Sequence, residues 1–273
     1  MTSGAGDGVT WRDETWQDDL QARIYEPPSS ARVQRAGAAV VNVHGGAWAH
    51  MDRTHGHGYC RAVAAAGFVV VAIDFRDGRV ARHPAAVDDV GSAVRWVRRH
   101  ATRLAVDADR VALMGSSSGG HLALLAALTG VEVPFVAALW PPVDPLARYR
   151  YAQSRIGQPV PEGQTFHPAE LAAASEAYFG DEATMGGASI AQVLAEGRAR
   201  FLPRVWLVRA GADLNVPAAM IDELVAAYRR AGGVLELTDY PGQVHGFGHG
   251  SHDAALRFHD ALVRQLAAAL TAP

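Results

Sequence analysis

Short apolar runs that alternate with longer segments of helical period limit the fold of this chain more than any other feature of its sequence. The runs are rich in valine, alanine and leucine and have the length of buried strands. They lie at residues 38–43, 69–74, 111–114, 136–140, 205–210 and 234–240, after an early hairpin near residues 21–25. The segments between them carry apolar residues at helical spacing, as Val87, Val90 and Val94 do. Because consecutive parallel strands need a helical crossover, this alternation predicts an α/β fold with a mainly parallel sheet flanked by helices.

One long interval interrupts this alternation. Between Trp140 and Val205 the chain has no run that resembles a strand. Pro168 with Glu170 after it, and Ser189 before an apolar stretch, are typical of helix starts. We therefore predict a single domain over residues 1–273, with a helical insertion at 141–204 that acts as a cap or lid over a site.

The basic residues are all arginine, which excludes several kinds of chemistry. Without lysine the chain has neither a Schiff-base nucleophile nor a P-loop lysine. The formal net charge of -3 does not favour nucleic acid as a partner. Cys60 is the only cysteine, so an internal disulfide and a thiolate zinc cluster are both excluded.

The amino-terminal residues are polar and acidic and do not resemble a secretion signal. No segment has the ~18 consecutive apolar residues that a membrane-spanning helix requires. We therefore expect a cytoplasmic protein that does not use a membrane as a partner. The sequence leaves the oligomeric state open.

The stretch MGSSSGGH at residues 114–121 contains three consecutive serines between a predicted strand and a predicted helix. In a G-x-S-x-G nucleophile elbow, the crowded positions two before and two after the serine favour glycine. Only Ser117 has glycine at both positions, Gly115 and Gly119. Ser117 is therefore the predicted nucleophile, and the alternative is a glycine and serine turn that caps a helix.

A serine nucleophile needs a base, and the base needs an acid that orients it. Asp213 follows the strand-like run at 205–210, and His245 follows the run at 234–240. This Ser, Asp, His order is that of the α/β-hydrolase arrangement, in which each residue lies on a loop after a strand. Alternatives in the sequence are Asp144 for the acid and His249 or His252 for the base.

The stretch VVNVHGGAW at residues 40–48 follows the first central strand and suits an oxyanion loop. Glycines let backbone N–H groups approach a developing oxyanion closely, so Gly45 and Gly46 are the predicted donors, with the backbone N–H of Ser118. Trp48 and Trp140 are candidates for an apolar substrate pocket, with core packing as the alternative.

With HGGAW, GSSSGG, GADLNVP and VHGF in this order, the chain resembles the α/β-hydrolase superfamily, specifically the esterases similar to hormone-sensitive lipase. The HGGxW form is also similar to kynurenine formamidase and feruloyl esterase relatives. The resemblance implies a mostly parallel eight-stranded sheet, a triad of Ser117, Asp213 and His245, and hydrolysis without a cofactor. Ala47 stands where a third glycine is usual, and FRDGRV at 75–80 replaces the YRLAPE signature, so the substrate stays open.

These observations predict a carboxylesterase-like serine hydrolase that cleaves esters of small or medium acyl groups through an acyl-enzyme. One alternative is an amide or formamide hydrolase, and another is a catalytically silent protein that binds a small molecule. A third, a metal-dependent hydrolase, is prompted by six loop histidines. These are His50, His55, His57, His245, His249 and His252. Their spacing lacks the helical H-E-x-x-H arrangement, so no metal is expected.

Overall fold

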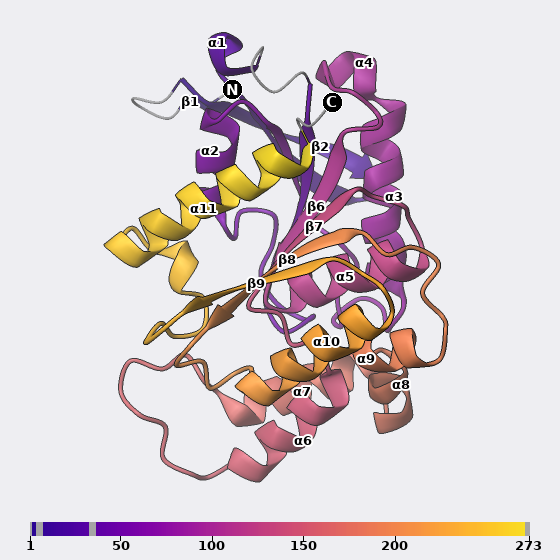
Figure 1. The fold of residues 1–273 in the computed structure, drawn as a ribbon, viewed down its shortest axis with the longest axis vertical. Helices are drawn as coiled ribbons and strands as arrows, with labels where there is room; N and C mark the ends of the chain where they lie inside the picture. Colours follow the sequence, from indigo (N-terminus) through magenta and orange to yellow (C-terminus); the bar gives the residue numbers. More distant parts are fainter. Residues whose placement is uncertain (1, 4–7, 33–36, 271–273) are drawn as a thin grey trace.

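The computed structural model describes residues 2–3, 8–32 and 37–270, and within them the chain forms one nine-stranded sheet covered by helices (Figure 1). The strand order is β1-β2-β3-β5-β4-β6-β7-β8-β9. The strands are β1 (Thr2–Ser3), β2 (Thr10–Gln17), β3 (Leu20–Glu26), β4 (Ala39–Val43), β5 (Val69–Ile73), β6 (Val111–Ser116), β7 (Phe135–Leu139), β8 (Arg204–Ala210) and β9 (Leu235–Tyr240).

The six strands from β4 to β9 pair in parallel, and the amino-terminal strands are antiparallel. The predicted mostly parallel sheet of eight strands is confirmed, and the two-residue β1 extends it at one edge. The predicted early hairpin is formed by β2 and β3. Each predicted strand lies within two residues of an observed one. The central strands β4, β5, β6 and β7 are buried on both faces, so each appears in the sequence as a nearly continuous apolar run.

Helices cover both faces of the sheet. They are α1 (Ser29–Arg32), α2 (His57–Ala65), α3 (Ala85–Arg99), α4 (Ala101–Leu104), α5 (Ser118–Thr129), α6 (Pro145–Arg155), α7 (Pro168–Phe179), α8 (Glu182–Gly187), α9 (Ile190–Ala195), α10 (Ala218–Arg230) and α11 (Asp253–Leu270). A short 3₁₀ helix, η2, spans Phe247–His249. Residues of α2 and α11 belong to one buried cluster, and residues of α3, α5 and α10 belong to the other. The sheet therefore separates two hydrophobic cores.

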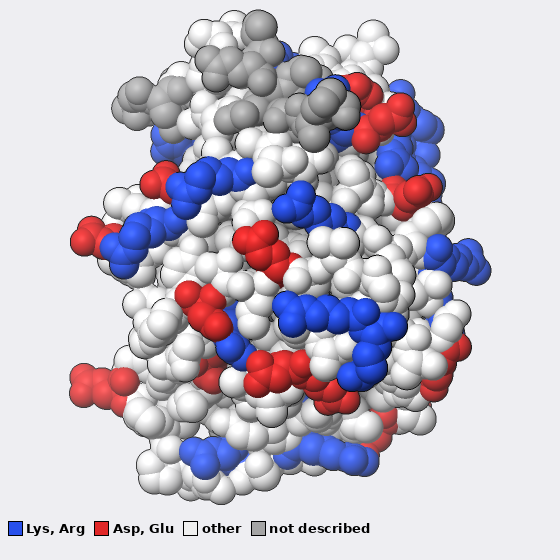
Figure 2. Space-filling model, in the orientation of Figure 1, with Lys and Arg blue, Asp and Glu red and all other residues white. Residues whose placement is uncertain are grey.

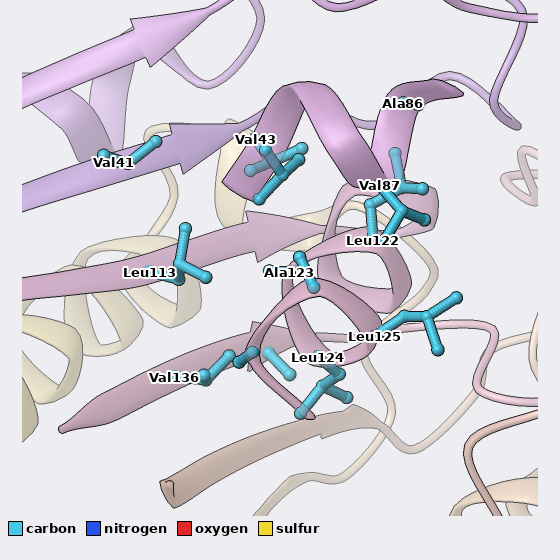
Figure 3. Packing of buried hydrophobic residues seen from close by; sticks show 14 of the residues in the cluster. Val41, Val43, Ala86, Val87, Leu113, Leu122, Ala123, Leu124, Leu125 and Val136 are labelled. Atoms are coloured by element: carbon cyan, nitrogen blue, oxygen red, sulfur yellow. The ribbon is translucent and has the colours of Figure 1, made fainter. Parts of the chain in front are cut away.

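Alternation along the central strands divides residues between the two cores. Val41 and Val43 of β4 pack on the side of α3 and α5, whereas Val40 packs on the side of α2 and α11. Figure 3 shows Val41 and Val43 on β4 and Leu122 on α5, all of which belong to the core on the side of α3 and α5. Full burial of a side chain such as Leu122 contributes about 1.5–3 kcal/mol relative to exposure. This packing fixes α5, and with it the turn that precedes the helix.

The interval between β7 and β8 is helical, as predicted, and contains α6, α7, α8 and α9. Helix α7 begins at the predicted Pro168, and α9 begins directly after Ser189. These helices gather at the lower end of the molecule in Figure 1, where α9 packs against α10. None of the helices in the described residues combines the length and the apolar character that crossing a membrane requires.

Candidate active site

Ser117 lies on the tight turn between β6 and α5, with a φ of 50° and a ψ of -128°. A positive φ is unfavourable for a residue with a Cβ atom, so the surrounding packing must hold this conformation. A Cβ atom on Gly115 would lie 2.4 Å from the Gly119 carbonyl oxygen, and one on Gly119 would lie 2.1 Å from the Val43 carbonyl oxygen. Both glycines of the predicted motif are therefore required by close backbone contacts.

The two neighbouring serines have different surroundings. The hydroxyl of Ser116 accepts a hydrogen bond from the Tyr59 hydroxyl at 3.3 Å, in the protein interior. Ser118 is fully buried and begins α5, so its backbone N–H has no acceptor within the helix. Of the three serines, only Ser117 lines a cavity that also contains His245.

The structure brings Ser117, His245 and Asp213 into one hydrogen-bonded chain. His245 Nε2 lies 2.8 Å from the Ser117 hydroxyl oxygen, and His245 Nδ1 lies 2.6 Å from Asp213 Oδ2. The other carboxylate oxygen accepts from the backbone N–H groups of Asn215 and Val216 at 2.7 and 3.0 Å. When Nδ1–H donates to the carboxylate, Nε2 is free to accept the serine proton. The arrangement can therefore deprotonate the Ser117 hydroxyl during an attack on a carbonyl.

The alternative residues have other surroundings. Asp144 caps α6, where its carboxylate accepts from the backbone N–H of Ala147 at 2.9 Å. His252 is exposed before α11. His249 lines the same cavity as His245, but its ring lies 4.0 Å from that of His55, and burial lowers its pKa to about 3. Among these residues, only Asp213 and His245 form the hydrogen-bonded chain with Ser117.

Gly45 and Gly46 follow β4 and approach the turn at Ser117. A Cβ atom on Gly45 would lie 3.2 Å from the Cβ of Ser117, which shows how closely the two backbones pass. Gly46 has a φ of 109°, and a Cβ atom there would lie 2.1 Å from the His50 carbonyl oxygen. Both glycines line the cavity beside Ser117. Their backbone is thus close enough to Ser117 for the predicted oxyanion loop.

The cavity at Ser117 has a volume of about 300 Å³. Its lining residues are Gly45, Gly46, Ala47, His50, Met51, His55, Ser117, Trp140, Arg148, Thr165, Leu171, Asn215, His245, Gly246 and His249. Trp140 is part of the cavity wall, and its role in binding a substrate stays a prediction.

The assignment of Trp48 to the substrate pocket is wrong. Its side chain is fully buried, and it is not among the residues that line the cavity. Its indole N–H donates to His121 Nδ1 at 3.3 Å, and its ring packs against Phe179 at a centroid distance of 5.0 Å. Trp48 has a φ of 62°, and no sequence pattern indicates this left-handed conformation. Trp48 therefore packs in the core, next to the loop that carries Gly45 and Gly46.

Sequence reasoning missed Arg148 in this cavity. Arg148 lies on α6 and is 2% exposed, and it occupies the buried side of the helix with Pro145, Tyr149 and Ala152. The spacing of these residues is a helical signal, but the charge of Arg148 suggests a solvent-facing position. Arg148 is thus a buried cation at the wall of the cavity that Ser117 and His245 line.

The remaining loop histidines do not form a metal centre within the described part of the chain. No group of three or more His, Cys, Asp or Glu side chains there is arranged to hold a metal ion. His57 Nδ1 lies 2.9 Å from the Tyr25 hydroxyl, and the His55 ring contacts the His249 ring.

Comparisons with known proteins relate the chain to esterases. The family model described as BD-FAE matches residues 23–138. Esterase LipI of Mycobacterium tuberculosis is 35% identical over 109 residues, which cover 40% of this chain and 34% of that protein. An ethyl acetate hydrolase of Pseudomonas putida is 33% identical over 144 residues, which cover 50% of this chain and 45% of that protein. The matches thus span less than half the length of these curated relatives.

Among solved structures, an inhibited esterase B from Lactobacillus rhamnosis superposes with a TM-score of 0.78 at 20% sequence identity. The match covers 96% of this chain and 88% of that one. At this level of identity the likeness shows a common fold, and it extends over nearly the whole chain.

Proposed function

We propose that the chain is a member of the α/β-hydrolase superfamily and a serine hydrolase that cleaves carboxylic esters of small or medium acyl groups. The observation that carries the proposal is the hydrogen-bonded chain from Ser117 through His245 to Asp213. Similarity to esterases supports the choice of esters as substrates.

In the first half of the proposed reaction, His245 Nε2 takes the hydroxyl proton of Ser117 as the oxygen attacks the ester carbonyl carbon. Asp213 holds the imidazole in the required tautomer and stabilises the imidazolium. Backbone N–H groups of Gly45, Gly46 and Ser118 donate to the oxyanion, and one such donor is typically worth about 2.7–4 kcal/mol in the transition state. The carbon–oxygen bond to the alcohol then breaks, and His245 gives its proton to the leaving alcohol.

In the second half, a water molecule attacks the acyl group on Ser117 while His245 Nε2 takes a proton from the water. The bond between the acyl carbon and the Ser117 oxygen breaks, and His245 returns the proton to Ser117. The products are a carboxylic acid and an alcohol, and the side chains regain their starting protonation states.

The cavity supports a small substrate. A volume of about 300 Å³ lies at the lower end of the range for small-molecule sites. The similarity to an ethyl acetate hydrolase agrees with a short acyl group and a small alcohol.

The segment at 141–204 is proposed to act as a cap on this site. Arg148, Thr165 and Leu171 belong to it, and all three line the cavity with Ser117 and His245. Thus the segment that differs most from the repeating strand and helix pattern forms part of the wall that a substrate contacts.

Hydrolysis of short p-nitrophenyl esters tests the proposal. Ser117→Ala is expected to lower kcat by at least about 10³-fold, because the nucleophile is lost. Ser116→Ala is the matched control on the same turn and is expected to retain most of the activity. Wild-type protein that releases no more nitrophenol than Ser117→Ala, on these esters and on N-formyl and acyl-amide substrates, would favour a binding protein without hydrolase activity.

A further inference from the structure

Arg148 is a cation buried at the wall of the Ser117 cavity. Its Nε–H donates to the Asn215 carbonyl oxygen at 3.3 Å, and its guanidinium carbon lies 5.3 Å from the centre of the Trp48 ring. Its Nη1 is buried and has no hydrogen-bond acceptor among the described residues. One edge of the guanidinium is thus held in place, while another donor is unused.

Surface arginines of this protein have different surroundings. Figure 2 shows basic and acidic side chains close to one another on the face in view. Arg209, for example, donates to both Asp222 and Asp239. A buried charge that forms no ion pair is unfavourable compared with such an exposed pair. Burial of the Arg148 charge is therefore energetically unfavourable if the residue serves only for packing.

The cavity wall contains no compensating carboxylate. Among the described residues that line it, the titratable side chains are Arg148 and four histidines, with no aspartate or glutamate. Asp213 is the acidic group that acts on Arg148 through its charge, but both of its oxygens already accept hydrogen bonds from other groups. Burial lowers the pKa of Arg148 to about 10, which leaves the guanidinium charged at neutral pH.

A second unused donor belongs to the same wall. The indole N–H of Trp140 is buried and has no acceptor among the described residues. Guanidinium and indole N–H groups only donate hydrogen bonds. Arg148 and Trp140 therefore favour a ligand group that is anionic and only accepts hydrogen bonds.

We infer that Arg148 determines substrate specificity by binding a free carboxylate of the substrate, so that the preferred substrates are small esters that also carry a carboxylate. A planar carboxylate matches the fork of donors that a guanidinium presents. Hemiesters of short dicarboxylic acids and acyl esters of short hydroxy acids both meet this description. The inference rests on the proposed esterase function and identifies its substrate class.

Two pairs of esters with matched shapes test the inference. Monoethyl succinate is compared with ethyl 4-methylpentanoate, which places the carboxylate on the acyl side. Acetoxyacetate is compared with isobutyl acetate, which places it on the alcohol side. In each pair an isopropyl group replaces the carboxylate, so that shape is kept while charge is removed. Release of acid or alcohol is followed for the wild type, Arg148→Met, Arg148→Lys and Arg150→Met.

We expect the wild type to prefer the anionic ester of at least one pair by tenfold or more in kcat/KM. Arg148→Met is expected to lower kcat/KM for that ester about 10- to 100-fold, mainly through KM, because a hydrogen bond to a charged group is lost. The neutral partner is expected to change by less than about threefold. Arg148→Lys should restore part of the preference, since the charge remains. Arg150 lies on the same helix but pairs with the exposed Glu182, so Arg150→Met should behave like the wild type.

Equal losses on both members of a pair would show instead that Arg148 only positions the Asp213 loop through Asn215. A wild type without preference in either pair would also overturn the inference. A calorimetric titration of Ser117→Ala with the same four esters measures binding without turnover. It therefore distinguishes a failure of the carboxylate site from a failure of the esterase proposal. If Ser117→Ala binds an anionic ester more tightly than its neutral partner, and Ser117→Ala/Arg148→Met does not, the carboxylate site is supported even without turnover. Equal binding of the two esters to Ser117→Ala contradicts the site.

Discussion

Asp213 and Asp144 are the two candidates for the acid that orients the base, and their hydrogen bonds differ. Oδ2 of Asp213 lies 2.6 Å from His245 Nδ1, while Oδ1 of Asp213 accepts two backbone N–H groups of the loop after β8. The loop fixes the carboxylate, and the carboxylate in turn orients the imidazole. The carboxylate of Asp144, the other candidate in the sequence, accepts the backbone N–H of Ala147 at the start of α6.

Asp213→Asn is therefore expected to lower kcat by roughly 10³- to 10⁴-fold, because an amide favours the wrong histidine tautomer. Asp144→Asn is the matched control: it keeps an N-cap residue of similar strength, so activity and stability should both change little. Steady-state kinetics and thermal unfolding of the two variants check this pair of expectations. Comparable losses of activity in both would reverse the assignment of the acid.

Residues at the ends of strands are predictable from sequence, whereas side-chain direction in loops and on short helices is not. Ser117, Asp213 and His245 each follow an apolar run whose end is visible in the sequence. Trp48 follows such a run as well, but left-handed φ values at Ala47 and Trp48 accompany a ring that lies in the core. Arg148 was missed because only the packing of α6 shows that this helix buries a charged residue.

The turn that carries Ser117 depends on how closely the elements β6, α5 and the end of β4 approach one another. Gly119, in the first turn of α5, lies against the Val43 carbonyl, and Gly115, one residue before the end of β6, lies against Gly119. These contacts leave no space for a Cβ atom. The close packing of two strands and a helix thus produces the strained conformation of Ser117.

Gly119→Ala is expected to destabilise the protein by about 1–3 kcal/mol or more, since the new methyl group meets backbone that cannot move freely. Activity should fall with it, because any relief shifts the turn that carries Ser117. Gly187→Ala, at the end of α8, is the control, since a Cβ atom there has no neighbour within 4 Å. Chemical denaturation measures the free energy of unfolding of both variants. An unchanged stability of Gly119→Ala would show that the turn tolerates a Cβ atom at this position.

The helical content of the segment at 141–204 was predictable, but its internal arrangement was not. Pro168 and Ser189 mark the starts of α7 and α9 because helix termini need distinctive residues. Which face of each helix meets the cavity depends on contacts between segments far apart in sequence, such as that of Arg148 with Asn215. Local patterns do not contain this information.

At the scale of the whole molecule, the fold keeps several histidines neutral. Burial lowers the pKa of His121 to about 4 and that of His249 to about 3, from an ordinary value of 6.5. His55, in ring contact with His249, also has a pKa lowered to about 4 by burial. In the unfolded chain these groups bind protons below pH 6.5, but in the folded protein they do so only near pH 4 and below. Stability must therefore fall as the pH decreases through this interval.

The free energy of unfolding is expected to decrease between pH 6.5 and 4.5 by up to about 1.4 kcal/mol per pH unit for each such histidine. Carboxylates held by arginines, such as Asp13 beside Arg23, have pKa values below the ordinary 3.8 and lose their contribution at lower pH. Urea denaturation across this range measures how the free energy of unfolding changes with pH. His249→Gln should reduce this slope by the contribution of about one proton. A stability that is flat or rises on acidification would contradict buried neutral histidines.

Covalent labelling with a fluorophosphonate identifies the nucleophile of this protein. Intact-mass measurement should show one phosphonyl group per chain, and peptide mapping should place it on Ser117, with none on Ser116 or Ser118. Ser117→Ala should remain unlabelled, and Asp213→Asn should react far more slowly. A label on another residue, or a wild type that reacts no faster than Ser117→Ala, would show that Ser117 is not the nucleophile.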